Sequence, residues 1–342
     1  MRDNAGLRPA HQRARRDPLN STEYQEDQQL LRRFDGNPIL KPEDWPYPVN
    51  SVFNPGAIRL VDTGEVLLMV RAEDRRGLSH FCAARSPDGI SNWRIAPKPT
   101  LLPDREKRPE ELWGIEDARI TWIPELERYG LVYTAYSEGG PGVSLALTRD
   151  FEHFDHYGLI LPPEDKDAAL FPRRFGGHWA IIHRPVPASG SAHIWISFSP
   201  DLRHWGSHKV LLPARRGAWW DARKIGLSTP PIETAAGWLI LYHGVRMTAS
   251  GCLYRIGLVL LDREDPLKVL YRSDEWIFGP LAPYERIGDV QDVVFPTGAV
   301  LGTDGDTLQV YYGAADTSVC LATASLRKLL DFLPGHSYLG TT

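Results

Sequence analysis

Short runs of apolar residues, separated by turn residues, recur along most of this chain. The runs are rich in Val, Ile, Leu and aromatic side chains, which is typical of buried β-strands. They form a unit that occurs five times: an opening run, a turn, and a second run that ends in polar residues. Four of the five opening runs carry a charged residue. The opening runs span residues 54–60, 114–120, 168–174, 227–232 and 292–299.

This repeat predicts an all-β fold, a five-bladed β-propeller with short helical segments near both ends of the chain. The second runs span residues 65–71, 129–136, 178–184, 237–243 and 308–314. Three units add a third run that closes on a turn and an aromatic residue, at 84–93, 146–154 and 197–205. Repeats of this size, made of strands joined by turns, are typical of propeller blades. The alternative is an ordinary β-sandwich whose strands resemble one another by chance.

The two ends of the chain stand apart from the repeat. Residues 1–35 are predicted to be an N-terminal extension, disordered where it is polar and basic. A capping box at 22–25, followed by Leu30, Leu31 and Phe34, predicts a short helix within it. Residues 36–334 are predicted to be the propeller and catalytic domain, with a second helix at 325–334, and residues 335–342 a C-terminal tail.

Composition narrows the class of protein. The chain has 342 residues and a formal net charge of −4, which argues against nucleic acid as a partner. It contains no apolar run of about 18 residues to span a membrane and no visible signal peptide, so we expect a cytoplasmic protein. Cys82, Cys252 and Cys320 are too few for a disulfide framework and include no Cys-x-x-Cys pair, so we expect no metal site.

Glu116 and Asp117 stand side by side inside one opening run. Two adjacent acids lower the β-propensity of a strand, so they need a particular reason. In a propeller the opening strands surround one axis, where their polar residues would converge on one pocket. Strand alternation puts Asp117 on the face of Ile115 and Glu116 on the other face, which favours Asp117 as an acid but leaves open which face looks inward.

The candidate inner residues differ in charge from unit to unit. The second and fifth units contribute carboxylates, Asp117 and Asp316, whereas the third and fourth contribute cations. The cations are Lys166, Arg184, Lys224 and His243. Such a cluster suits an oxyanion such as phosphate. A hydrolase normally needs two acids, whereas phosphate is already a charged nucleophile, so the sequence favours one acid and an anion site.

Structural roles are the alternative for several of these residues. Arg71 and Arg184 could instead pair with carboxylates between blades, and His183 is expected to be packed or hydrogen-bonded. The alternative also applies to Trp113, Trp219 and Trp220, which could stack on sugar rings or pack in the core. Other charged residues fall near strand ends in the same pattern: Glu73, Asp74, Arg119, Asp167, Arg173, Arg174, Asp221, Arg223 and Asp292.

Several segments match, in order, the motifs of a known family. They are residues 49–57, 70–75, 114–119 (Gly-Ile-Glu-Asp-Ala-Arg), 170–173, 182–185, 220–226, 241–245 and 313–317. On these residues the chain resembles glycoside hydrolase family 130, the inverting β-mannoside phosphorylases and their relatives. The Phe-Asn-Pro-Gly sequence at 53–56 is similar to the mannooligosaccharide branch. The family fold is a five-bladed β-propeller, which agrees with the repeat.

The resemblance implies a role for each matching residue. Asp117 falls on the general acid. The positions that bind phosphate in the phosphorylases are occupied in this chain by Lys166, Arg184, Lys224 and His243. Asn54, Arg71 and Asp316 fall on contacts to the mannosyl unit, and Glu116 is expected to orient its neighbours or bind a sugar hydroxyl. The first phosphate position is often Arg in the family, so Lys166 keeps the charge but loses the bidentate fork.

The activity implied is inverting phosphorolysis of a β-mannoside to α-mannose 1-phosphate and a shortened sugar. Inorganic phosphate is then a co-substrate, and no metal or organic cofactor is implied. A β-mannoside hydrolase on the same scaffold, a carbohydrate-binding propeller without catalysis and a furanosidase-type propeller are the alternatives. Relatives imply a homo-oligomer; the linkage and the acceptor sugar stay open.

Overall fold

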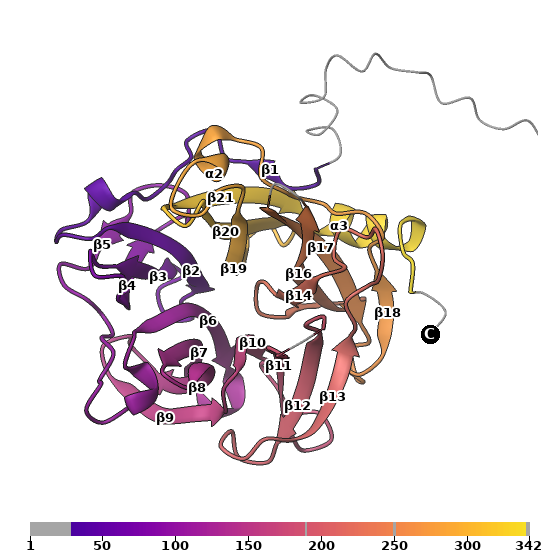
Figure 1. Cartoon of the computed structure of the whole chain (residues 1–342), viewed down its shortest axis with the longest axis horizontal. Coiled ribbons are helices and arrows are strands. Elements are labelled where there is room, and N and C mark those ends of the chain that lie inside the picture. The colour runs from indigo at the N-terminus through magenta and orange to yellow at the C-terminus, as the bar shows by residue number, and fades with distance from the viewer. Residues whose placement is uncertain (1–28, 189, 249–250, 340–342) are drawn as a thin grey trace, which may run out of the picture.

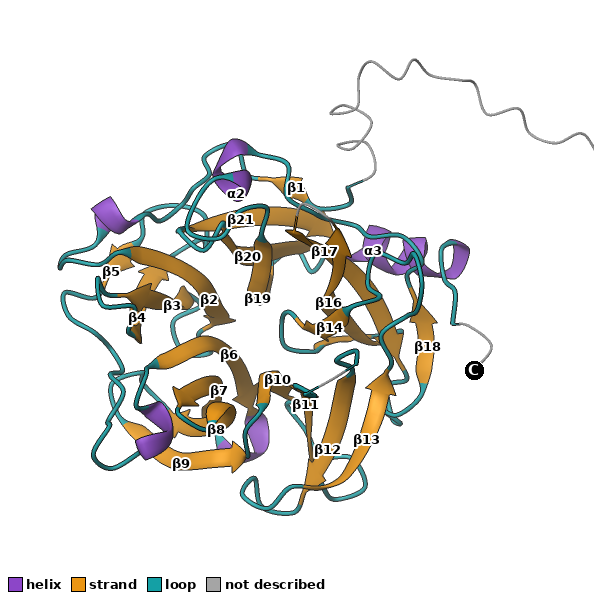
Figure 2. Ribbon diagram, in the orientation of Figure 1, coloured by secondary structure: helices purple, strands orange, loops and turns teal. Residues whose placement is uncertain are grey.

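The computed structural model describes residues 29–188, 190–248 and 251–339. Their strands form five antiparallel sheets arranged around a central axis (Figure 1). The predicted five-bladed β-propeller is therefore confirmed. Short helices lie outside the ring of innermost strands (Figure 2). None of the described helices is long and apolar enough to cross a lipid bilayer.

Within a blade the strands follow one another in the chain from the centre to the rim. The first blade contains β2 (Ser51–Arg59), β3 (Val66–Glu73), β4 (Ser79–Ser86) and β5 (Arg94–Ile95). The second contains β6 (Ile115–Ile123), β7 (Arg128–Ser137), β8 (Gly140–Thr148) and β9 (Phe154–Leu161). The third contains β10 (Asp165–Leu170), β11 (Trp179–Pro185), β12 (Ile194–Ser199) and β13 (Gly206–Leu212).

The fourth blade has an additional short strand. It contains β14 (Lys224–Leu227), β16 (Gly237–Thr248), β17 (Gly251–Leu261) and β18 (Val269–Arg272), with β15 (Ile232–Thr234) paired to β16. The helices and 3-10 turns join blades or follow the last one, except η3 (Pro124–Leu126), which joins β6 to β7 within the second blade. The others are η1 (Pro42–Asp44), η2 (Pro109–Glu111), α2 (Pro283–Arg286), α3 (Leu326–Phe332) and η4 (Leu333–Gly335). The predicted helix at 325–334 is present as α3 and η4, and the Ser325 hydroxyl accepts the Lys328 N–H at its start.

The fifth blade joins the two ends of the chain. Its inner strands are β19 (Val294–Leu301), β20 (Thr307–Ala314) and β21 (Ser318–Ser325), and its rim strand is β1 (Arg32–Arg33). The predicted N-terminal helix begins outside the described residues. Where the structure describes this segment the prediction is wrong, because Arg32 and Arg33 form a strand. Pairing with β1 satisfies the backbone hydrogen-bonding groups at the edge of β21, whereas a short isolated helix is only marginally stable in water. The propeller therefore begins before residue 36.

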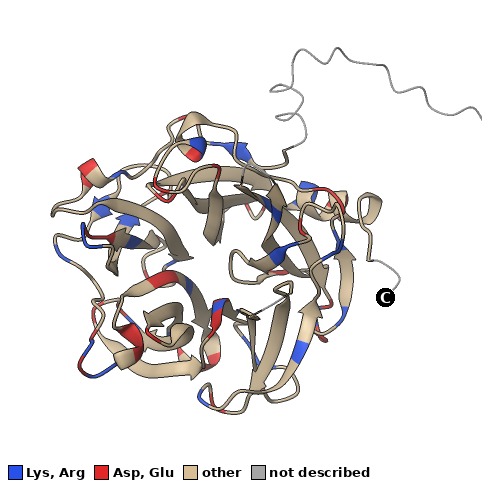
Figure 3. Ribbon diagram, viewed as in Figure 1, with Lys and Arg blue, Asp and Glu red and all other residues tan. Residues whose placement is uncertain are grey.

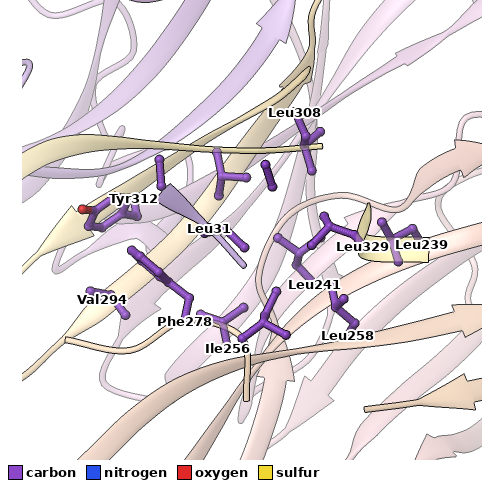
Figure 4. Close-up of a cluster of buried hydrophobic side chains, with 14 of the residues drawn as sticks. Leu31, Leu239, Leu241, Ile256, Leu258, Phe278, Val294, Leu308, Tyr312 and Leu329 are labelled. Atoms are coloured by element: carbon purple, nitrogen blue, oxygen red, sulfur yellow. The ribbon is translucent and has the colours of Figure 1, made fainter. Parts of the chain in front are cut away.

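Hydrophobic side chains fill the space between neighbouring blades. One cluster joins the fourth and fifth blades and includes Leu31, Leu241, Ile256 and Phe278. Figure 4 shows Leu31 among side chains from both blades. The segment that leads into β1 therefore contributes to the core as well as to the sheet.

Candidate active site

The innermost strands of the first three blades share one irregularity. Each contains a register shift of the kind made by a β-bulge. There one residue has left-handed backbone: Asn54 (φ 45°), Asp117 (φ 53°) and Asp167 (φ 53°). Asn and Asp tolerate this conformation better than most residues, and a bulge redirects a side chain. The bulges therefore turn a polar residue of each blade toward the same central cluster.

The bulge in β6 changes the relation between the two adjacent acids. Arg71 donates to both of them, from Nη1 to Asp117 Oδ1 at 3.2 Å and from Nη2 to Glu116 Oε1 at 3.1 Å. The expectation that alternation would put the two side chains on opposite faces is therefore wrong. Simple alternation holds only where the ladder is regular, and between Glu116 and Arg119 it is not.

Asp117 is buried and closely held. Its Oδ1 atom accepts a hydrogen bond of 2.9 Å from Asn54 Nδ2 as well as the bond from Arg71. Burial alone would raise the pKa of Asp117, but Arg71, Lys166 and Arg119 and the Asn54 bond hold it below its ordinary value. Asp117 is thus ionised at neutral pH when no ligand is bound.

Asp316 is the second carboxylate near this point. It lies in the turn between β20 and β21 with φ 50°. Burial raises the pKa of Asp316 to about 6, and the negative charges of Asp117 and Glu116 act in the same direction, against Arg71 and Lys166. The pKa of Asp316 is therefore shifted upward, whereas the pKa of Asp117 is shifted downward.

A second group surrounds Asp167. Arg184 Nε donates to Asp167 Oδ2 at 2.7 Å, and His243 Nε2 lies 3.5 Å from the same oxygen. Arg119 Nη2 lies 3.7 Å from the other oxygen. Burial opposes ionisation, but Arg184, His243, Lys166 and Arg119 hold the pKa of Asp167 well below its usual range. The expected cluster of cations therefore has a carboxylate at its centre.

His243 differs from the other members predicted to be cations. Burial lowers its pKa to about 3, and the charges of Arg184 and Lys224 oppose protonation while Asp167 favours it. The imidazole is therefore neutral at neutral pH. The prediction from the sequence that His243 is one of the cations is wrong. Its Nδ1 atom is buried and has no hydrogen-bond partner among the described residues. A neutral ring can donate or accept a hydrogen bond here.

Lys224 and two aromatic residues border the same group. Lys224 begins β14, and its Nζ atom lies 5.4 Å from the centre of the Tyr254 ring. Burial lowers the pKa of Lys224, as do Arg184 and Lys166, while Asp167 raises it. The Phe295 ring lies 4.8 Å from the His243 ring. Tyr254 and Phe295 were missed by sequence reasoning, because aromatic residues in apolar strands give no signal that separates them from core.

Arg119 connects blades across the centre. Its guanidinium donates to the backbone carbonyls of Asp117, Leu227 and Ser228 at 2.8–3.1 Å. It is buried and links β6 of the second blade to the end of β14 in the fourth. Its role is to hold inner strands in place rather than to face a ligand. Figure 3 shows charged segments where β6, β10 and β14 approach the centre.

The comparisons with known proteins agree with this geometry. Residues 24–334 match a family model, Glyco_hydro_130, described as β-1,4-mannooligosaccharide phosphorylase. The chain belongs to glycoside hydrolase family 130. The resemblance found from the sequence motifs is thereby confirmed.

Curated relatives of family 130 differ in the linkage that their names carry. The chain is 41% identical over 257 residues to the β-1,2-mannobiose phosphorylase of Listeria innocua, covering 75% of this chain and 69% of the relative. It is 33% identical over 317 residues to the β-1,4-mannooligosaccharide phosphorylase of Ruminococcus albus, covering 90% and 92%. A solved structure of the Listeria innocua β-1,2-mannobiose phosphorylase with β-1,2-mannobiose matches with a TM-score of 0.80 at 33% identity, covering 90% of this chain and 99% of that one.

The structure brings together the residues that the family motifs single out. Contacts or charge interactions link Asn54, Arg71, Glu116, Asp117, Lys166, Arg184, Lys224, His243 and Asp316. A surface hollow of about 750 Å³, lined by Arg85, Lys98 and Phe151 among others, contains none of them. Among the described residues, no group of three or more His, Cys, Asp or Glu is arranged to hold a metal ion.

Other charged candidates lie outside this central cluster. Arg173 and Arg174 make ion pairs at the surface with Glu264 and Glu125. Both residues lie after the end of β10. The innermost strand of the third blade therefore begins and ends earlier in the chain than the predicted opening run at 168–174. Asp292 is paired with Arg286 in an exposed position.

Asp221 and Trp220 have structural roles. Asp221 is fully buried and accepts hydrogen bonds from Arg272, Arg215 and the Tyr242 hydroxyl. Trp220 is buried in the cluster between the third and fourth blades, so the core alternative holds for it.

Proposed function

We propose that this protein is a β-mannoside phosphorylase, which transfers a mannosyl unit from a β-mannoside to inorganic phosphate. The products are α-mannose 1-phosphate and a shortened sugar. The observation that carries the proposal is the position of one closely held acid, Asp117, beside a group that contains Arg184, Lys224 and Lys166. The phosphorylase names of the family 130 relatives support the same reaction.

The cations of the third and fourth blades bind phosphate in this proposal. Arg184 is oriented by its bond to Asp167, which leaves the rest of the guanidinium for the anion. Lys224 and Lys166 add point charges. His243 contributes as a neutral hydrogen-bonding group, because its pKa of about 3 excludes a positive charge at neutral pH. Phosphate then attacks the anomeric carbon from the face opposite the leaving group.

Asp117 supplies the proton to the leaving group, directly or through a sugar hydroxyl. In the free enzyme its pKa is low, so it must gain a proton as ligands bind. Bound phosphate offsets the charge of Lys166 and its neighbours, and bound sugar excludes water; both changes raise the pKa of a carboxyl group. Asp117 can therefore act as a general acid only when phosphate and sugar are bound.

The mannosyl unit is held by the first, second and fifth blades. Asn54, Arg71, Glu116 and Asp316 present amide, guanidinium and carboxylate groups, which suit the hydroxyl groups of a sugar. The side-chain charges supply the anion site, so the mechanism uses no metal or organic cofactor, and phosphate is the co-substrate.

A single assay tests the proposal. The purified protein is incubated with β-1,2-mannobiose and β-1,4-mannobiose, with and without inorganic phosphate, and products are separated. We expect α-mannose 1-phosphate only when phosphate is present, and the preferred disaccharide reports the linkage. Mannose release at the same rate without phosphate would indicate a hydrolase, and sugar binding without turnover would indicate a carbohydrate-binding propeller.

The variant Asp117→Asn tests the acid. The amide cannot donate the proton to the leaving oxygen, so turnover should fall by about 100-fold or more, in line with the loss of general acid catalysis. The fold should stay the same, because the amide has the shape of the acid, but the thermal unfolding midpoint should fall, because the buried charge that pairs with Arg71 is lost. Near-normal turnover would contradict the assignment of Asp117.

A further inference from the structure

A chain of hydrogen bonds crosses all four strands of the third blade. It contains one residue from each strand: Asp165 from β10, His183 from β11, Ser197 from β12 and His208 from β13. Asp165 Oδ2 lies 2.6 Å from His183 Nδ1. His183 Nε2 lies 2.7 Å from Ser197 Oγ, which lies 2.7 Å from His208 Nδ1. The proposed reaction uses none of these four residues.

The chain runs from the interior to the surface. Asp165, His183 and Ser197 are at most 5% exposed, whereas His208 is exposed. One arrangement of protons satisfies all three bonds with neutral rings. His183 Nδ1–H donates to Asp165, Ser197 O–H donates to His183 Nε2, and His208 Nδ1–H donates to Ser197 Oγ.

The order Asp, His, Ser is that of a serine hydrolase, but access excludes this role. Ser197 is completely buried. A nucleophile must reach the reacting carbon of its substrate, so Ser197 cannot act as one. The chain must therefore act on the structure of the blade.

The inner end of the chain lies directly behind the proposed anion site. Asp165 immediately precedes Lys166, and Lys166 pairs with Arg184 across the two strands. Successive residues of a strand face opposite sides, so His183 and Arg184 point away from each other. The neighbours agree: Ile181, on the side of His183, packs between the second and third blades, and Ile182 packs between the third and fourth.

Polar side chains join the start of β10 to β11, through the pairs Asp165–His183 and Asp167–Arg184. Residues 165–167 are all charged, and the apolar residues of the strand begin only at Ala168. The Val186 N–H donates to the Glu164 carbonyl at 2.9 Å, so Asp165 and Pro185 form the non-hydrogen-bonded pair that follows in the ladder. The ladder then breaks at the bulge after Lys166. The bond from His183 to Asp165 therefore adds a side-chain link between β10 and β11 just before this break.

We propose that His183 and Asp165 are positioning residues, which fix the start of β10 so that Lys166 and Arg184 are held at the spacing that binds phosphate. Ser197 and His208 hold the outer edge of the His183 ring. The inference rests on the proposed phosphorylase function, and its experiment separates the failure of one from the failure of the other.

Two variants of His183 separate the two bonds of its ring. The amide of Asn reaches about as far as Nδ1, so His183→Asn keeps the bond to Asp165. The amide of Gln reaches about as far as Nε2, so His183→Gln keeps the bond to Ser197 and leaves Asp165 unpaired. We expect KM for phosphate to rise about tenfold or more in His183→Gln and to stay within about twofold in His183→Asn, because small displacements of binding groups are costly.

The measurements include KM for β-mannobiose, kcat and direct titration with inorganic phosphate. A positioning role changes phosphate affinity and leaves KM for the sugar near its original value. His204→Asn is the matched control, since His204 lies 2.7 Å from Asp201 in an exposed turn of the same blade. It should change neither constant.

The outcomes distinguish the two proposals. If the unaltered protein is active without phosphate, the proposed function fails and this inference fails with it. If the unaltered protein depends on phosphate and the two His183 variants have equal KM for phosphate, only the inference is overturned. Should His183→Gln not fold, Asp165→Asn decides in its place. A rise in KM for phosphate alone supports the proposal, and an unchanged KM or an equal rise for both substrates overturns it.

Discussion

Asp117 and Asp316 show how the same functional group acquires different properties at the scale of single residues. Asp117 has Arg71 and Asn54 bound to one oxygen, and these contacts stabilise its charge. Burial raises the pKa of Asp316 to about 6, and a neighbouring carboxylate adds to the shift. In the empty site the proton therefore resides more readily on Asp316 than on the proposed acid. Binding of phosphate and sugar has to raise the pKa of Asp117 before this residue can donate a proton.

The raised pKa of Asp316 predicts a measurable cost to stability. Its pKa rises from 3.8 to about 6, so the folded protein keeps this proton to higher pH than the unfolded chain. Stability from this group is therefore present below about pH 4 and is lost as pH rises to about 6. Asp316→Asn removes the charge and should stabilise the fold at pH 7.5 by at most about 3 kcal/mol. Urea unfolding at pH 7.5 and pH 4 checks this, since the gain should vanish at pH 4, while turnover falls at both.

Arg184 is predicted to need its guanidinium and not only its charge. Arg184→Lys keeps a positive charge but loses the Nε donor that binds Asp167 at 2.7 Å. We expect KM for phosphate to rise about tenfold, the equivalent of one charge-assisted hydrogen bond. Arg174→Lys is the control, because Arg174 pairs with Glu125 at the surface. Equal KM values for phosphate in both variants would contradict a specific role for the guanidinium.

At the scale of elements, the repeat in the sequence was enough to predict the blades but not the irregularities that make the site. Apolar runs and turns specify strands, and β2, β6 and β19 lie on predicted opening runs. Alternation alone does not show where a ladder breaks, so the shared approach of Glu116 and Asp117 to Arg71 was not predicted. β1 was missed for a different reason. Residues 32–33 form a strand only because β21 offers them an edge, and the local sequence does not contain that information.

Gly226 tests how closely β14 must pass the central cluster. A Cβ atom at this position would come to 2.4 Å from Asp167 Oδ2 and 2.5 Å from His243 Cε1. Gly226→Ala should therefore displace both side chains, with a loss of about 1–3 kcal/mol in the free energy of unfolding and weaker phosphate binding. Gly206→Ala in β13 is the control, because a Cβ there meets nothing within 4 Å. Unchanged phosphate affinity in Gly226→Ala would show that the cluster has room to move.

For the whole molecule, the ring of blades depends on how the chain closes it. The rim strand of the fifth blade comes from residues 32–33, and the other three strands come from residues 294–325. Arg33 donates to Glu285 at 2.7 and 2.8 Å, and the buried Glu285 also accepts the Tyr312 hydroxyl. The central cluster takes residues from all five blades, so its spacing depends on a closed ring.

Leu31 is the residue whose loss should open this closure most directly. It is 1% exposed and packs between the fourth and fifth blades with Phe278 and Leu329 (Figure 4). Leu31→Ala leaves a cavity and should lower the free energy of unfolding by about 3 kcal/mol. Leu339→Ala, at a position that is 55% exposed, should change it by less than about 0.5 kcal/mol. Turnover at 25 °C should stay near the original value, because the folded ring is intact, but activity should be lost at a lower temperature than in the control. If Leu31→Ala unfolds at the same urea concentration as the control, closure by the N-terminal segment does not stabilise the propeller.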